Sequence, residues 1–201
     1  MAIRTANNQS LTEITALPSA VALGGLVLLE TQTASSSATI DFTDNIDSTY
    51  SEYIFKFINL HPATDAVTFG FQADTGTNTS YNQTMTTTAF YSENTEADGG
   101  GGMAYSTGRD QAQGSAFQQI SDDIGNGNDE CSSGSLIIFS PSSSTFVKHF
   151  ISLVNGYQNG NYSQAWHHSG YFNTTTALTR VQFKMSSGNI DAGTFKLYGV
   201  T

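Results

Sequence analysis

The 201-residue chain has few charged residues and a single cysteine, and each shortage removes a class of protein. Charged residues make up 12% of the sequence, about half the usual share, which is atypical of a helical protein with a charged surface. Because Cys131 is the only cysteine, no disulfide can form within the chain. A small secreted fold held by disulfides is therefore excluded.

Basic residues are scarce as well. Seven Lys and Arg stand against seventeen Asp and Glu, which gives a formal net charge of −10, and the basic residues are scattered singly along the chain. A protein that binds nucleic acid needs a concentrated cationic face to displace counterions. We therefore expect neither nucleic acid nor an anionic membrane as a partner.

Long apolar runs are also missing. The first residues lack the apolar stretch of a signal peptide, and the most apolar region, residues 17–29, is interrupted by Pro18 and by Gly24 and Gly25. It is too broken to span a bilayer. We expect an acidic, soluble chain that is made in the cytosol.

Sequence motifs of common enzyme classes are absent. There is no Gly-x-Ser-x-Gly elbow, no glycine-rich phosphate loop with a lysine, and no His-Glu-x-x-His. Cys131 stands among acidic residues, which disfavour the thiolate that a nucleophile requires. We expect a protein that is not an enzyme. A glycoside hydrolase needs only two suitably spaced carboxylates, so that hypothesis stays open as a third alternative.

Short segments rich in Phe, Tyr, Val, Ile and Thr predict a fold made of β-strands. Residues 52–60 give the strongest pattern, with aromatic side chains on one face and Ile54, Ile58 and Leu60 on the other, so we expect this strand to be buried on both faces. Turn clusters and the lack of strand–helix alternation favour an all-β fold: an antiparallel β-sandwich, jelly-roll-like, over residues 26–201. The ten predicted strands are residues 26–33, 37–42, 52–60, 66–72, 84–91, 135–140, 145–154, 164–172, 178–185 and 194–200.

Residues 1–25 have a different pattern. Ser10 and Glu13 have the spacing of a helix capping box, and Leu11, Ile14 and Leu17 would line one face of a short helix that Pro18 ends. We interpret this segment as an N-terminal arm that anchors the domain to a partner through those three apolar residues. A first strand with a frayed lead-in is the alternative.

Residues 93–134 interrupt the strand pattern with glycines and acidic residues, so we interpret them as a long functional insertion. Together with the loops at 74–82 and 155–161, they are expected to form the end that faces a receptor. The run at 122–130 offers carboxylates that suit Ca²⁺, although it lacks the EF-hand spacing. A solvated acidic loop without a cofactor is the expectation, and a Ca²⁺ site is the alternative, formed by Asp122, Asp123, Asp129 and Glu130.

Several tyrosines and the single tryptophan of the C-terminal half stand among short, uncharged polar residues. Aromatic faces stack on sugars, while Asn and Thr side chains hydrogen-bond to hydroxyl groups. The candidate ligand-binding residues are Tyr157, Tyr162 and Trp166. A plain polar exterior is the competing interpretation.

Several segments of the chain resemble small virion proteins of tailed phages from marine environments, notably those that infect cyanobacteria. The segments are residues 1–11 (MAIRTANNQSL), 14–18 (ITALP), 53–59 (YIFKFIN), 61–65 (HPATD) and 187–199 (SGNIDAGTFKLYG). Proteins of this kind are structural or tail-fibre-like. The resemblance implies a virion component, either a capsid decoration or head fibre or a part of a tail fibre.

The resemblance and the residue patterns together predict a non-enzymatic virion protein, exposed on the particle and attached by its N-terminal arm. Its partners would be other virion proteins and further copies of itself, with a trimer as the first expectation because fibres are commonly trimeric. The alternative is a carbohydrate-binding module that contacts glycans on the host surface.

Overall fold

The computed structural model describes residues 25–201, and this part of the chain is built from antiparallel strands. It contains no helix, and so none that could cross a membrane. The predicted all-β class is confirmed. The anchoring residues Leu11, Ile14 and Leu17 lie outside the described residues. The strands are β1 (Leu26–Ser37), β2 (Ile40–Phe42), β3 (Glu52–Pro62), β4 (Val67–Thr75), β5 (Met85–Thr95), β6 (Gly101–Tyr105), β7 (Ala112–Gly114), β8 (Gln118–Ile124), β9 (Ser132–Phe139), β10 (Lys148–Gln158), β11 (Tyr162–Phe172), β12 (Leu178–Met185) and β13 (Ile190–Val200).

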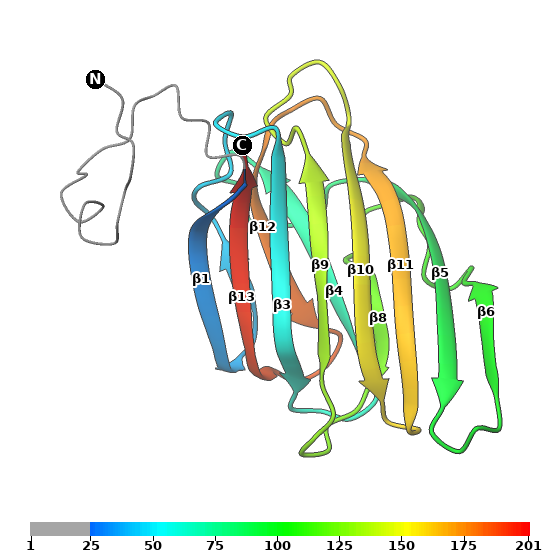
Figure 1. Ribbon diagram of the computed structural model, residues 1–201. Helices are drawn as coiled ribbons and strands as arrows, with labels where there is room; N and C mark the ends of the chain where they lie inside the picture. Colours follow the sequence, from blue (N-terminus) through cyan, green and yellow to red (C-terminus); the bar gives the residue numbers. More distant parts are fainter. Residues whose placement is uncertain (1–24) are drawn as a thin grey trace, which may run out of the picture.

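The strands lie in two layers (Figure 1). The large layer follows the order β1, β13, β3, β9, β10, β11 and β5, and both β6 and β7 pair with the far edge of β5. The small layer contains β8, β4, β12 and β2. One residue pair, Gln158 with Ile124, joins β10 to β8, and β1 approaches β2 on the other side. The hydrogen-bonded sheet therefore nearly closes on itself around its interior.

Phenylalanine fills the interior beneath β3 and β13. Because successive side chains of a strand point to opposite faces, inward residues alternate along Tyr53–Phe57 of β3, Val181–Met185 of β12 and Phe195–Gly199 of β13. Phe183 on β12 is fully buried, and its ring centroid lies within 6.3 Å of six others. Three of these contacts are edge-to-face, with Phe42, Phe55 and Phe57, and packing of this kind adds to the free energy gained by burying the rings. The six neighbours are Phe42, Phe55, Phe57, Phe69, Phe71 and Phe195.

Polar side chains fill the interior beneath β5 and β11, where residues 106–118 and β8 form the cover. Gln118 is fully buried, accepts a hydrogen bond from Thr87 at 2.8 Å, and donates one to the carbonyl of Arg109 at 2.8 Å. His168 is also buried, and neither of its ring nitrogens has a hydrogen-bond partner. The two parts of the interior thus differ in chemistry.

The ten strands predicted from the sequence are all present, but the interpretation of residues 93–134 as an insertion was wrong. That stretch contains β6, β7 and β8. β6 is glycine-rich and exposed along its whole length, so it shows no apolar alternation. β8 pairs with β4 through two register shifts and carries several polar residues, and this irregularity conceals its periodicity.

The expectation that β3 is buried on both faces was also wrong. Ile54 is only partly buried, and Ile58 is 41% exposed. Two residues of β3 lie opposite Gly193 of β13, and Asn59 adopts a left-handed conformation with φ of 52°. This β-bulge shifts the alternation by one residue, so that Leu60 points inward with the phenylalanines.

The molecule has two ends with different contents. Gly25 and Thr201 meet at one end, where their backbones and the Thr201 hydroxyl exchange hydrogen bonds of 3.1 and 3.2 Å; we call this the entry end. At the opposite end lie the β5–β6, β8–β9 and β10–β11 connections, and we call this the turn end (Figure 1). β4 begins at Val67, beside the turn end, and runs to Thr75 at the other end of the molecule. The loop at 76–84, which follows Thr75, therefore lies at the entry end. The expected grouping of that loop with residues 155–161 was wrong.

Candidate functional site

A hollow of about 520 Å³ opens at the turn end, where β5, β10 and β11 meet the β8–β9 loop. We call it the tyrosine hollow. A second hollow of about 490 Å³ adjoins it and shares Asp129 and Cys131 with it. The tyrosine hollow is lined by Asn94, Thr95, Glu96, Asp129, Cys131, Asn155, Gly156, Tyr157, Tyr162 and Ser163.

Strand pairing brings these residues together from distant parts of the sequence. The backbone N–H of Tyr157 donates to the carbonyl of Cys131 at 3.0 Å, and the Asn155 amide donates to the Ser163 hydroxyl at 3.2 Å. Tyr162 pairs with Thr95, which places Glu96 at the margin of the hollow. Each tyrosine therefore lies beside a hydrogen-bonding side chain contributed by a neighbouring strand.

The tyrosine hollow has a negative electrostatic character. Burial raises the pKa of the Tyr157 hydroxyl, and a hydrogen bond with Glu96 and the charges of Glu96, Asp129 and Glu130 raise it further. The hydroxyl donates to the side chain of Asn161 at 3.2 Å. A protonated phenol, carboxylates and amides suit recognition of a ligand that carries many hydroxyl groups and no negative charge.

Of the three predicted ligand-binding residues, two lie together in the structure and the third is buried elsewhere. Tyr157 and Tyr162 both line the tyrosine hollow. Trp166 is only 2% exposed, on the inward side of β11, where its indole N–H donates to Gln164 at 2.7 Å. Its ring packs between Tyr91 and His168. Trp166 therefore cannot stack on a sugar in this structure, and its assignment as a ligand-binding residue was wrong.

The four acidic residues proposed for Ca²⁺ do not converge. Asp122 and Asp123 lie on β8, whereas Asp129 and Glu130 lie in the β8–β9 loop. Asp122 forms a two-pronged ion pair with Arg109 at 2.8 Å, while Glu130 accepts a hydrogen bond from the backbone of Gly127. Among residues 25–201, no group of three or more His, Cys, Asp or Glu could hold a metal ion. The structure therefore gives no support to the alternative of a Ca²⁺ site.

The sequence analysis did not identify two residues of the hollow, Glu96 with its carboxylate and Asn94 with its amide. The predicted strand ended at residue 91, whereas β5 continues to Thr95 and carries both residues to the turn end. The sequence signal that could have revealed them is the register with β11, which needs the partner strand to be known. A single strand does not contain that information.

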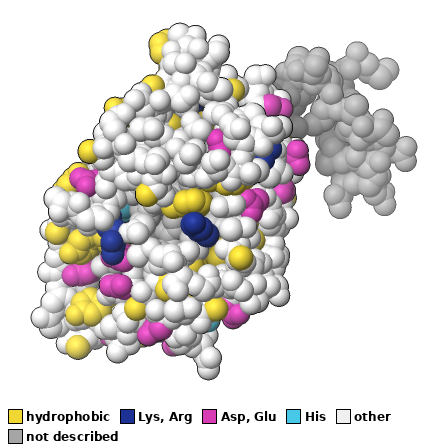
Figure 2. All heavy atoms as spheres, turned by 180° about the vertical axis from the view of Figure 1, so that it is seen from behind, with side chains coloured by type: hydrophobic (Ala, Val, Ile, Leu, Met, Phe, Trp, Pro, Cys, Tyr) yellow, Lys and Arg dark blue, Asp and Glu magenta, His cyan; other side chains and the backbone are white. Residues whose placement is uncertain are grey.

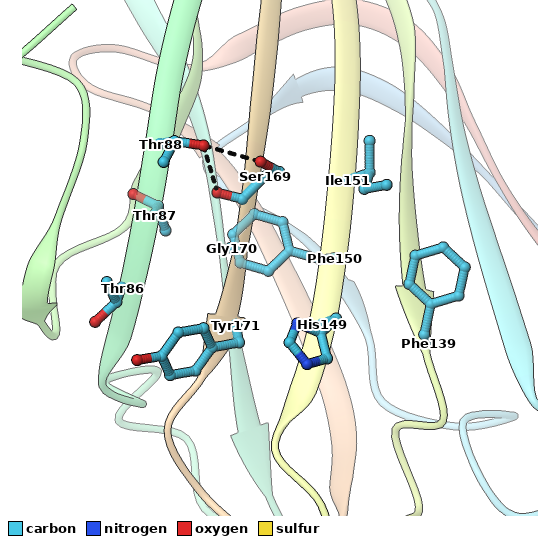
Figure 3. A pocket seen from close by; sticks show the side chains of 10 residues that line it. All are labelled: Thr86, Thr87, Thr88, Phe139, His149, Phe150, Ile151, Ser169, Gly170 and Tyr171. Carbon is cyan, nitrogen blue, oxygen red and sulfur yellow. Dashed lines mark hydrogen bonds between the residues drawn. The ribbon is translucent and has the colours of Figure 1, made fainter.

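A second concave area lies on the outward face of the large layer (Figure 3). It has a volume of about 370 Å³, and Tyr171 and His149 border it on one side. The Thr88 and Ser169 hydroxyls share a hydrogen bond of 2.9 Å, the Thr88 hydroxyl also lies 3.4 Å from the Ser169 carbonyl, and both residues line the area. No carboxylate or cationic side chain lines it. The area can take an apolar or hydroxyl-bearing group but offers no ion pair.

Comparison with known proteins gives no relative: no protein-family model matches the chain, and no curated protein or solved structure matches it either.

Proposed function

We propose that this chain is a structural protein of a tailed-phage virion, exposed on the particle and without enzymatic activity. Its position would be that of a capsid decoration, a head fibre or a tail-fibre component, and its partners would be other virion proteins. The resemblance of residues 1–11, 14–18, 53–59, 61–65 and 187–199 to virion proteins of marine phages supports the proposal. So does a described region in which paired antiparallel strands enclose a continuous core.

One observation carries the proposal: the segment that precedes the domain joins it at the end opposite the tyrosine hollow. β1 begins at Leu26, which pairs with Val200 at the entry end. The β10–β11 turn, which carries Tyr157 and Tyr162, lies at the other end (Figure 1). A protein attached through residues 1–25 would therefore present the tyrosine hollow away from the particle.

We further propose that residues 26–201 are a β-sandwich of the jelly-roll type. The large and small layers enclose one hydrophobic core, as the two sheets of a sandwich do. Direct links between the layers are few, as in the single pair between β10 and β8.

Deleting residues 1–24 tests the attachment. We expect the remaining domain to fold with an unchanged circular dichroism spectrum and melting temperature, because residues 25–201 already enclose a continuous hydrophobic core. The shortened protein should no longer sediment with particles. Tyr157→Ala in the full chain is the control, since a change at the opposite end should leave incorporation intact. Loss of folding, or undiminished incorporation of the shortened protein, would contradict the arm as an anchor.

The tyrosine hollow favours a second function, recognition of glycans on the host surface. Its two tyrosines supply aromatic faces, and Glu96, Asp129 and Asn155 supply acceptors and donors for sugar hydroxyls. The negative charge around Tyr157 favours neutral over acidic sugars. A panel of neutral and sialylated oligosaccharides, probed with the full chain, tests this function. We expect binding to neutral members only, lost in Tyr157→Ala and retained in Tyr91→Ala. Equal binding by the Tyr157 variant would contradict a role for the hollow.

A further inference from the structure

The exposed apolar side chains of the described residues are concentrated on one layer. Every large hydrophobic residue that is at least two-fifths exposed belongs to the large layer or to its β9–β10 loop. None belongs to the small layer. These residues are Leu26, Leu28, Ile58, Phe90, Met103, Tyr105, Phe146, Ile151 and Leu153.

Strand register joins several of them into a continuous row. Leu153 on β10 lies opposite His167 on β11, which lies opposite Phe90 on β5. The rings of Phe90 and His167 stack in parallel with centroids 4.7 Å apart, and Phe90 in turn faces Tyr105 on β6. Ile151 belongs to the next row, where it pairs with Ile137 of β9. The rows border the concave area of Figure 3, so the surface has both raised and hollow parts.

Four adjacent strands of this face carry no charge. The outward positions of β9, β10, β11 and β5 hold Ser, Thr, Asn, Ala, His, Tyr, Phe, Ile and Leu, and no Asp, Glu, Lys or Arg. We call these outward positions the neutral face; those nearest the turn end, Asn94, Asn155, Tyr157 and Ser163, also line the tyrosine hollow. The opposite side of the molecule carries acidic and basic side chains interspersed over its surface (Figure 2). In a chain with a net charge of −10, four neighbouring strands whose outward positions are all uncharged are a marked departure.

The neutral face is large enough for a stable contact. Strands of eleven residues, such as β10, are about 35 Å long, and four strands are about 19 Å across, which gives roughly 700 Å² in plan. Each partner in a standard protein interface buries about 800 Å². The cores of such interfaces are depleted of charge and enriched in aromatic residues, as this face is.

We propose that the neutral face binds a second copy of the chain, so that two molecules pack large layer against large layer. A strongly acidic protein repels its own copies unless they meet where neither is charged, and the neutral face meets that condition. A cationic partner would instead require acidic groups that this face lacks. The pair is two-fold because only one such face occurs among residues 25–201, whereas a ring needs two different complementary surfaces. This assembly differs from the trimer expected from the sequence.

Light scattering after size-exclusion chromatography tests the pair. At micromolar concentration the full chain should have a mass near 43 kDa, twice the 21.5 kDa of one chain. Leu153→Glu places a charge in the middle of the neutral face, and Ile151→Glu does so one row away. Both side chains are about half exposed, so each variant should fold. We expect each to raise the dissociation constant at least tenfold and to elute near 21.5 kDa.

Thr175→Glu is the matched control, because it adds the same charge on an exposed loop between β11 and β12. It should retain the mass of the pair, and circular dichroism should be the same for all variants. A wild-type protein that is monomeric at 100 μM (a concentration on the order of 100-fold above a micromolar Kd) would overturn the proposal. So would a trimer, or a pair that persists in both Glu variants.

Discussion

The interior beneath β3 and β13 and the interior beneath β5 and β11 are built from different side chains. The first is a cluster of phenylalanines centred on Phe183. The second holds the buried Gln118, Gln164, Trp166 and His168; Trp166 donates to Gln164 and Gln164 donates to the partly buried Glu93, whereas the His168 ring nitrogens have no partner. The apolar half is stabilised by the area that it removes from water, whereas the polar half depends on each donor and acceptor finding its partner.

The two halves also carry different surfaces of the molecule. The tyrosine hollow and most of the neutral face are carried by β5, β10 and β11, which lie over or beside the polar interior. The apolar half contains β1 and β13, whose flanking residues Gly25 and Thr201 meet at the entry end. We therefore interpret the apolar half as the scaffold and the polar half as the part that is presented. Four substitutions test this comparison.

The largest effect is expected from Phe183→Ala. Removing a fully buried ring that contacts six others should lower the free energy of unfolding by about 3–5 kcal/mol. Urea denaturation followed by fluorescence measures the change. Phe146→Ala is the control, because that side chain is 73% exposed and should contribute little. A loss below about 1 kcal/mol at Phe183 would mean that the apolar half is not the scaffold.

A smaller loss is expected from Gln118→Leu in the polar half. The substitution keeps much of the volume but leaves the Arg109 carbonyl and the Thr87 hydroxyl without their Gln118 partner. Buried polar groups left unpaired cost about 1–3 kcal/mol. Gln113→Leu, at an exposed position of β7, should change stability by no more than about 0.5 kcal/mol. If the two variants were equally stable, the polar network would contribute nothing to the fold.

The polar half should also make stability depend on pH through His168. Burial, followed by the charges of His167 and Arg109, lowers the pKa of His168 from 6.5 to about 3. Since the unfolded chain takes up the proton first, stability is complete above pH 6.5 and falls as the pH is lowered toward 3. Between pH 7 and pH 5 the loss from this group is about 2 kcal/mol at most.

The His168→Phe variant isolates that loss. The difference in unfolding free energy between the variant and the wild type should shift in favour of the variant as the pH falls, since all other titrating groups are shared. His149→Phe is the control, because His149 is exposed. A wild-type-minus-variant difference that is constant from pH 7 to pH 5 would show that His168 takes up its proton in the folded state.

The smallest effect is expected at the bulge of β3. Asn59 has a φ of 52°, which Asn and Gly tolerate and β-branched residues do not. Asn59→Val should cost about 1–2 kcal/mol, and Asn59→Gly should be within about 0.5 kcal/mol of wild type. Thermal unfolding of the two variants checks this order. The reverse order would mean that the bulge does not set the inward position of Leu60.

The sequence predicts the scaffold well because its information is local. The patterns of β3 and β12 are recognised as strands without knowledge of any partner strand, although the apolar residues on the second face of β3 led to the wrong expectation that both faces are buried. The bulge at Asn59 was missed, since it depends on pairing with Gly193 of a distant strand.

The presented half is less predictable because its features come from contacts between strands. Tyr157 and Tyr162 were identified by residue type, but Glu96 reaches them only through the pairing of β5 with β11. Trp166 and the buried Phe172 are an even number of positions apart on β11 and so point to the same face, but the prediction for Trp166 rested on residue type alone. Arg109, which pairs with Asp122, stands thirteen residues earlier in the chain, and no motif links the two.

Imaging of virions by electron cryomicroscopy, at a resolution that traces the chain, tests the proposed function most directly. The account predicts density on the particle surface that fits residues 25–201, with Gly25 and Thr201 toward the particle and the turn between β10 and β11 pointing away from it. Virions that lack this protein, or that hold it with the β10–β11 turn against the particle, would contradict the account.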